Sequence, residues 1–432
     1  LILGGGLGGL LCAALLAREG MAVRVLEKNK QIGGCLQSYA LDGHLVESAV
    51  HYVGSLSPGQ SMHTLLTYLG VLPEWKIAQL DTACFDEIIL ADRSYPLAQG
   101  DQDFIESLGT CFPHARRQLQ QYVAELNRVC AHFPMYHLNA GDPHHKEAVL
   151  PAGLQQTMDH IIQDEQLKRV LTGNHLLYAG SYSTNPFYQH ALIQSSFMEG
   201  AYKSRQGGAG LARILTKVIQ AAGGVVQRNT AVCKLRESDG KLLYAEDQEG
   251  RQYYARQFIS TLHPRQTMQI LDSDLIRPAM RARLKDMKQT VSCFLLNIAL
   301  HPGKVPYINH NKYYHPEGSN WLTDECGYSK PVYGIYFSED HQMPGFTQCI
   351  SVLTYLPYEK VMPWANSFKT HHEGCREEAY ETFKQEYAEK IMQELSPIIP
   401  GLKAAVKQIN TATPLTYRDY LGSPEGSLYG IQ

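Results

Sequence analysis

The first 27 residues combine a cluster of glycines with two short apolar runs, and this combination strongly limits the folds open to the chain. After Leu-Ile-Leu, the residues Gly4, Gly6 and Gly9 have the spacing Gly-x-Gly-x-x-Gly and precede an Ala- and Leu-rich stretch. A second apolar run ends at Glu27, 18 residues beyond Gly9. Strand, glycine turn, helix, strand and terminal acid, in this order, are typical of a dinucleotide-binding β-α-β unit.

Each of these residues has its own physical role in such a unit. Gly4 permits a tight turn out of the strand, Gly6 lets the backbone approach a pyrophosphate, and Gly9 lets helix and strand pack closely. The pyrophosphate would lie at the positive N-terminus of the helix. Glu27 would accept hydrogen bonds from ribose hydroxyls and would repel a 2′-phosphate, which disfavours NADP. FAD and NAD both carry the free ribose diol, so both stay open at this point.

The residues after Glu27 favour FAD through a family resemblance. Gly33-Gly34-Cys35 follows the acid closely, and His51-Tyr52-Val53-Gly54 lies further along. Both segments resemble the retinol saturase and carotenoid isomerase branch of the phytoene desaturase family, within the amine oxidase superfamily. In that family the glycine pair lets the backbone approach FAD, and the next strand passes beside the flavin. Glu47 and Ala49 depart from the family, which usually has Asp and Gly there. Without the resemblance, residues 40–54 would be only a supporting β-hairpin.

Two later segments extend the resemblance over most of the chain. In the family a return strand grips adenine through the backbone of a valine, and Val232 is the matching position. The segment 258–264, which contains Ser260 and Thr261, is similar to the strand and turn that pass the adenosine half of FAD. Taken as bare sequence, these segments would be a plain β-α-β meander.

The tail also resembles the retinol saturase and phytoene desaturase families, over residues 413–430. There it returns from the substrate domain to the flavin, so a turn at 426–430 is expected beside the isoalloxazine ring, with Tyr429 near the substrate side. The alternative is a surface turn rich in Pro and Gly. Only three residues precede Gly4 and the chain stops at Gln432, so we expect a fragment trimmed at both ends that holds FAD weakly or not at all.

The fold class implied by the resemblance is α/β, with a Rossmann-like FAD-binding domain built from discontinuous segments and an inserted α+β substrate domain. A chain of 432 residues is too long for one ordinary core, which agrees with two interleaved domains. The predicted FAD-binding domain comprises residues 1–75, 195–288 and 411–432. The predicted substrate domain comprises residues 76–194 and 289–410.

Composition excludes several other classes of function. A net charge of −3 and a pI near 6.7 give no electrostatic reason to expect nucleic acid. The ten cysteines have no metal-ligand spacing, and the pairs His144-His145 and His371-His372 are expected in polar loops, so no metal site is predicted. Scattered thiols suit a reducing compartment, which favours a cytoplasmic protein with or without peripheral contact at the cytoplasmic face of a membrane. A helical apolar stripe over 119–133 could face a membrane or an apolar ligand, but packing on its own domain is favoured.

The resemblance implies an FAD-dependent oxidoreductase acting on carbon–carbon double bonds of an apolar polyene, with reduction favoured over desaturation or cis–trans isomerisation. No catalytic residue is assigned, because the flavin carries the redox chemistry. A second dinucleotide fingerprint is absent from the sequence, so a nicotinamide would visit transiently or another reductant would serve. A non-enzyme alternative is a binder of lipidated proteins similar to Rab GDP-dissociation inhibitors. Tyr52 and Tyr429 are the substrate-side candidates. The predicted cofactor-binding residues are Gly4, Gly6, Leu7, Gly9, Glu27, Lys28, Gly33, Gly34, Cys35, His51, Val232, Ser260 and Thr261.

Overall fold

The computed structural model of the chain describes residues 1–142, 144–179, 181–273, 276–322, 330–369 and 376–432. The pair His371-His372 lies outside these ranges. Within them, no helix combines the length and the hydropathy that crossing a membrane requires.

The N-terminal fingerprint folds into a parallel sheet assembled from four distant segments. The strand order is β13-β1-β2-β9, and every neighbouring pair is parallel. The strands are β1 (Ile2–Leu3), β2 (Arg24–Leu26), β9 (Val225–Gln227) and β13 (Ile259–Ser260). Helices α1 (Leu7–Arg18) and α8 (Gly207–Ala221) pack against each other beside this sheet. Parallel neighbours need crossover connections, which explains why the sheet draws on residues more than 200 positions apart.

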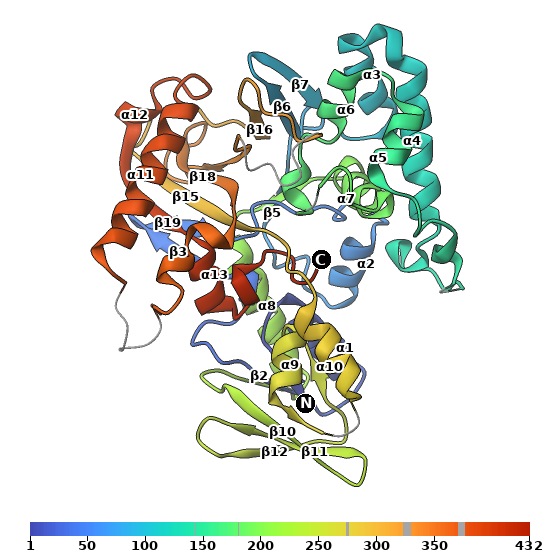
Figure 1. The fold of residues 1–432 in the computed structure, drawn as a ribbon, viewed down its shortest axis with the longest axis vertical. Helices are drawn as coiled ribbons and strands as arrows, with labels where there is room; N and C mark the ends of the chain where they lie inside the picture. The colour runs from blue at the N-terminus through green and yellow to red at the C-terminus, as the bar shows by residue number, and fades with distance from the viewer. Residues whose placement is uncertain (143, 180, 274–275, 323–329, 370–375) are drawn as a thin grey trace.

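A second, mainly antiparallel sheet continues the same region of the molecule (Figure 1). Its order is β12-β11-β10-β14, with only the last pair parallel. The strands are β10 (Val232–Ser238), β11 (Lys241–Asp247), β12 (Gln252–Tyr254) and β14 (Leu271–Asp272). Helices α9 (Pro264–Ile270) and α10 (Pro278–Asp286) follow β13; α9 packs on β10 and β14, and α10 packs on α9.

The largest sheet in the described part of the chain has seven strands, in the order β19-β15-β18-β17-β16-β6-β7. Its strands are β6 (Asp86–Leu90), β7 (Arg93–Leu97), β15 (Ser292–Leu300), β16 (Asn311–His315), β17 (Tyr333–Glu339), β18 (Thr347–Leu356) and β19 (Val406–Ala412). The chain turns between β6 and β7 at Ala91, which has a left-handed φ of 55°. Within the sheet β6 pairs with β16 in parallel, whereas β15, β17 and β18 pair antiparallel.

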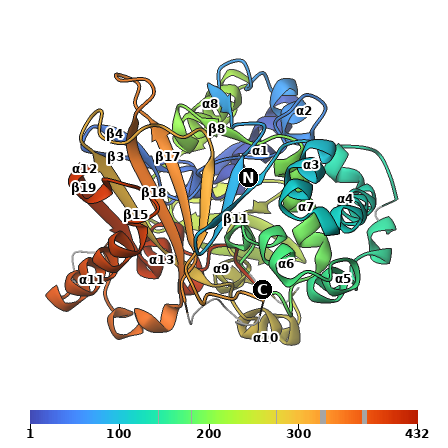
Figure 2. The same ribbon diagram turned by 90° about the horizontal axis from the view of Figure 1, so that it is seen from above.

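Both faces of this sheet are covered (Figure 2). Alternate residues of β15 point to opposite sides, as the pleat requires. Phe294 and Leu296 pack with α11 (Glu378–Leu395), whereas Cys293 and Leu295 pack in the cluster that includes the helices of residues 101–198. Those helices are α3 (Asp101–Cys111), α4 (Arg116–Ala131), α5 (Leu154–Ile161), α6 (Glu165–Leu171) and α7 (Phe187–Met198).

The apolar stripe of α4 is part of this core and does not face outward. Leu119, Tyr122 and Leu126 have no exposed surface, and α4 packs against α7. Of the two interpretations of the stripe, packing on its own domain is therefore the correct one. The hydrophobic face of α4 is buried in the core.

The remaining elements include two short antiparallel strand pairs and three helices. The hairpin of β3 (Ser38–Leu41) and β4 (His44–Glu47) is antiparallel, as is the pair of β5 (Ile77–Gln79) and β8 (Tyr202–Ser204). The remaining helices are α2 (Ser61–Tyr68), α12 (Leu402–Ala405) and α13 (Pro414–Leu421).

A buried ion-pair network fixes α13. The carboxylate of Asp419 accepts a hydrogen bond from Arg376 at 2.6 Å, another from Arg418 at 2.8 Å and a third from the backbone N–H of Lys369 at 2.9 Å. The side chains of Asp419 and Arg376 are 0% and 7% exposed. Removing one partner of such a pair leaves an unpaired buried charge.

We therefore expect Asp419→Ala to lower the free energy of unfolding by about 3–5 kcal/mol, measured by urea denaturation. The control is Glu381→Ala, which removes the ion pair of an exposed carboxylate with Lys384 and should cost at most about 1 kcal/mol. Equal losses in the two variants would contradict the importance of the buried network.

Candidate functional site: a nucleotide cleft and an adjoining cavity

A cleft of about 540 Å³ opens at the carboxyl ends of β1 and β2. This is the edge of a parallel sheet at which α/β proteins bind ligands. Nine of the predicted cofactor residues line it. They are Gly4, Gly6, Leu7, Glu27, Lys28, Gly34, Cys35, Val232 and Thr261.

The glycines allow backbone segments to approach very closely at this cleft. A Cβ built on Gly9 would lie 2.0 Å from the carbonyl oxygen of Gly4, and Gly4 itself has a φ of +99°. A Cβ on Gly34, where φ is +55°, would lie 3.1 Å from the Cα of Gly6. Gly9 is thus buried behind the cleft and sets the distance between the turn and α1.

The N-terminus of α1 faces this space without a side-chain cap. Gly6 is the N-cap residue and makes no side-chain hydrogen bond to the first turn. Helices leave their first backbone N–H groups without intrahelical partners, and these groups together with the helix dipole attract anions. The donors at the start of α1 therefore match a pyrophosphate.

Glu27 is buried and its carboxylate is held by backbone groups. One oxygen accepts from the N–H of Gly5 and the other from the N–H of Asn29, each at 2.8 Å. Glu27 still lines the cleft, and a carboxylate has lone pairs for further donors. The side chain therefore shapes the loop and also presents an acceptor to a ligand.

Cys35 lies exposed to the cleft. Surrounding protein atoms nevertheless desolvate the thiol enough to raise its pKa. The Cys35 thiol is thus open to solvent but enclosed by protein atoms, as expected for a side chain on the wall of the cleft.

Four other predicted residues lie away from the cleft lining. Gly33 is buried behind Gly34, where a Cβ would lie 3.2 Å from the Cβ of Ala212. The hydroxyl of Ser260 is hydrogen-bonded to Thr267 at 2.7 Å. His51 and Tyr52 line a second cavity.

Several cleft residues escaped the sequence analysis. Those with polar side chains are Asn29, Thr230, His263, Gln266, Gln269 and Tyr420. Asn29, Thr230 and His263 lie within two residues of a predicted position, and that proximity was the available signal. Asn29 also donates to the carbonyl of Tyr420 at 2.8 Å and joins α13 to the cleft rim, a long-range contact with no local signature.

The second cavity, of about 220 Å³, adjoins the cleft through Leu7, which lines both. Its walls are largely apolar and aromatic. They include Leu36, Val50, Tyr52, Val53, Met62, Trp75, Phe197 and Leu211. An apolar hollow beside a nucleotide cleft suits an apolar ligand.

A buried hydroxyl network holds Tyr52 in this wall. Its hydroxyl donates to Asp86 at 2.9 Å and is also hydrogen-bonded to the hydroxyl of Tyr313 at 2.8 Å. Burial raises the pKa of Asp86 to about 6, although Asn311 also donates to its carboxyl group. The orientation of Tyr52 is therefore fixed by residues from the large sheet.

Tyr429 occupies the tail turn, with Gly426 and Gly430 both in the left-handed region at φ of 65° and 79°. Its ring is half exposed, and its hydroxyl donates to the carbonyl of Leu176 at 3.1 Å. The turn thus exists, and Tyr429 reaches the helical side of the molecule. Its position relative to a flavin stays a prediction.

The β3–β4 hairpin is attached to α8 by side-chain capping. Glu47 accepts from the N–H of Gly208 at 3.0 Å and from the hydroxyl of Ser38 at 3.0 Å. Ser38 in turn accepts from the N–H of Ala209 at 3.2 Å. Burial raises the pKa of Glu47 to about 7. Within the described residues, no group of three or more His, Cys, Asp or Glu could hold a metal ion.

Comparison with known proteins agrees with this architecture. Residues 2–69 match the model of the NAD(P)-binding Rossmann-like domain. Human all-trans-retinol 13,14-reductase is 25% identical over 99% of this chain and 76% of its own length. A phytoene desaturase (lycopene-forming) from Paracoccus is 21% identical over 100% of this chain and 87% of its own, and a prolycopene isomerase of an Oncidium hybrid is 22% identical over 100% and 74%.

The chain is thus an oxidoreductase whose homologues are all-trans-retinol 13,14-reductases, a phytoene desaturase and a prolycopene isomerase. The sequence-based assignment to this family and to its fold is confirmed. Solved structures share the fold, among them an oxidoreductase from Methanosarcina mazei (TM-score 0.65, 17% identity, 98% of this chain and 90% of that one). Cyclohexylamine oxidase from Brevibacterium oxydans has a TM-score of 0.61 at 15% identity (98% and 86%). A Rab GDI from Plasmodium falciparum has a TM-score of 0.52 at 12% identity (95% and 88%).

The close approach of Gly9 to Gly4 gives a direct test of the turn. We expect Gly9→Ala to lower the free energy of unfolding by about 2–3 kcal/mol or more, because the added methyl meets a backbone oxygen. Gly8→Ala is the matched control, since a Cβ there meets no atom within 4 Å and alanine favours the helix. Thermal unfolding measures both variants. A Gly9→Ala protein as stable as Gly8→Ala would contradict the geometry.

Proposed function

We propose that this chain is an FAD-dependent oxidoreductase that reduces a carbon–carbon double bond of an apolar, conjugated substrate. The observation that carries the proposal is the apolar cavity that meets the nucleotide cleft at Leu7. Its support from similarity is the match to retinol 13,14-reductases over nearly the whole chain.

The residues of the cleft fit FAD. The uncapped N-terminus of α1 would hold the pyrophosphate, Glu27 the ribose, and the backbone of Val232 the adenine. Gly34 and Cys35 lie next in the cleft, where only a glycine at position 34 permits the approach to Gly6. FAD bound there would supply hydride transfer. A transiently bound nicotinamide or another reductant would reduce the flavin again.

The protein side of the reaction is binding, orientation and exclusion of water. Leu7, Leu36 and Trp75 form walls that exclude water from an apolar ligand. Tyr52 is fixed through Asp86, so its ring forms a rigid wall of the cavity. In this proposal residues 1–75, 195–288 and 411–432 bind the nucleotide, and residues 76–194 and 289–410 hold the substrate. An apolar substrate also suits peripheral contact with a membrane.

Desaturation and cis–trans isomerisation are the alternatives within the same family, as the phytoene desaturase and prolycopene isomerase relatives illustrate. A binder of lipidated proteins would share the fold with the Rab GDI. The intact glycine turn and Glu27 favour the enzyme, because a protein that binds no nucleotide has no need for both.

The ribose role of Glu27 predicts a loss of affinity for FAD. Glu27→Ala should weaken FAD binding about tenfold or more, since a hydrogen bond to a charged group contributes about 1.5–3 kcal/mol. Glu27→Gln keeps an acceptor without the charge, so its affinity for FAD should lie between those of the wild-type protein and Glu27→Ala. Glu19→Ala, at the exposed end of α1, is the control. Binding is measured by quenching of flavin fluorescence, with thermal unfolding of each apoprotein to separate loss of the site from loss of the fold. Unchanged affinity in Glu27→Ala would remove the ribose assignment.

The proposed reaction predicts that polyenes reoxidise the reduced protein. The flavin-loaded protein, reduced with dithionite under anaerobic conditions, is mixed with retinol and with carotenoids. We expect the oxidised flavin absorbance to return and a product to appear that has gained the mass of H₂. A fully saturated alcohol is the control and should give neither signal. An isomerised product without reoxidation would identify the isomerase alternative, and neither signal across the polyene panel would remove the reductase proposal.

A further inference from the structure

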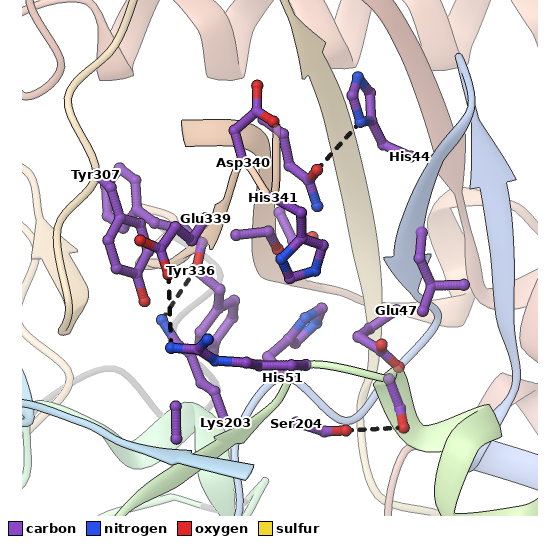
Figure 3. A pocket seen from close by; sticks show the side chains of 18 of the residues that line it. His44, Glu47, His51, Lys203, Ser204, Tyr307, Tyr336, Glu339, Asp340 and His341 are labelled. Atoms are coloured by element: carbon purple, nitrogen blue, oxygen red, sulfur yellow. Dashed lines mark hydrogen bonds and ion pairs between the residues drawn. The ribbon is translucent and has the colours of Figure 1, made fainter. Parts of the chain in front are cut away.

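A polar pocket of about 580 Å³ adjoins the apolar cavity (Figure 3). The hairpin β3–β4, strands β8 and β17 and their loops supply its lining. Figure 3 shows Lys203, His51 and Tyr336 close together, with Glu47 to one side.

This pocket and the apolar cavity share part of their lining. Glu47, His51 and Ser204 line both. The polar pocket and the apolar cavity therefore adjoin at these side chains. A ligand that reaches into both must itself be amphipathic.

Lys203 is a cation of this pocket with no ion pair among the described residues. Its ammonium donates to the backbone carbonyl of Phe337 at 3.2 Å. Burial lowers its pKa to about 7, and the charge of the more distant Asp86 offsets this only in part. A lysine in such surroundings needs an anion to keep its charge.

The other charged groups of the pocket have partners of their own. Arg205 lies 3.8 Å from Glu339. Asp340 accepts from the backbone N–H groups of Gln342 and Met343. Lys203 is therefore the side chain of this lining whose charge a ligand anion would neutralise.

His51 supplies a second unsatisfied group. Its Nε2 is buried and has no hydrogen-bond partner in the described part of the chain. The ring is stacked on Tyr336 at 4.3 Å with an interplanar angle of 8°, so its orientation is fixed. Burial and the nearby Lys203 lower the pKa of His51 to about 3, so the imidazole is neutral and can donate from one nitrogen.

We propose that this pocket binds the carboxylate of an amphipathic acid whose apolar chain lies in the adjoining cavity, with Lys203 as counter-ion and His51 Nε2 as hydrogen-bond donor. This inference rests on the proposed function in taking that cavity as the substrate site. A monoanion matches one ammonium group better than a phosphate does, because Glu339 and Asp340 also line the pocket. The N-terminus of α8 offers no further anion site, since Glu47 and Ser38 already cap it.

The test compares an acid with its neutral ester on the whole chain. The probe is cis-parinaric acid, a fluorescent conjugated fatty acid, alongside its methyl ester. We expect the wild-type protein to bind the acid more tightly, and Lys203→Met to weaken binding of the acid about tenfold or more while binding of the ester changes little. Lys203→Arg should retain much of the preference. Lys217→Met is the control, because it removes the same charge from an exposed position on α8.

A second measurement uses the unmodified protein, so it does not depend on the variants folding. Reductive methylation followed by peptide mass spectrometry reports the reactivity of Lys203. The acid should protect Lys203, and the ester should not. Equal binding of acid and ester by the wild-type protein, or equal protection by both, would overturn the inference. Reduction of neutral polyenes without any preference for acids would overturn it and leave the proposed function intact. A preference for acids without flavin reoxidation by any polyene would support the carboxylate site and contradict the proposed reduction.

Discussion

The carboxylate of Glu27 is the contact on which the nucleotide cleft depends. Its oxygens accept from Gly5 and Asn29, so it joins the glycine turn to the segment after β2. The backbone of the same residue pairs with Gln227 and Thr230 at the end of β9. Three segments separated by up to 225 positions therefore meet at one buried acid. A shorter side chain there would leave the N–H groups of Gly5 and Asn29 without their acceptor, while the backbone pairing with β9 would remain.

The local parts of this architecture are predictable because short-range rules decide them. The spacing of Gly4, Gly6 and Gly9 fixes a turn that only glycine can make, and a period of two or of about 3.6 identifies strands and helices. The helical apolar stripe over residues 119–133 follows from such a pattern, and the structure places most of it on α4, packed within its own domain.

The long-range parts are not predictable in this way. The parallel pairing of β6 with β16 joins residues about 225 positions apart, and its register places Ile88 beside Tyr313. Nothing in either segment alone specifies the other. Ser260 shows that a matching motif does not fix the partner of a side chain. It lies in the segment that resembles the family, but its hydroxyl is hydrogen-bonded to Thr267. Lys203 went unnoticed for a similar reason. Its significance comes from the absence of an acidic partner among the residues that the structure describes, and this becomes visible only in the assembled pocket.

The environment of Cys35 has a consequence for chemical durability. Thiols are oxidised through the thiolate, and the sulfenic, sulfinic and sulfonic acids form in sequence from it. The raised pKa of Cys35 keeps the sulfur protonated at neutral pH even though the side chain is open to the cleft. A smaller thiolate fraction means slower reaction with peroxide. This wall of the cleft therefore resists the gain of oxygen atoms and negative charge better than it would with an ordinary exposed cysteine.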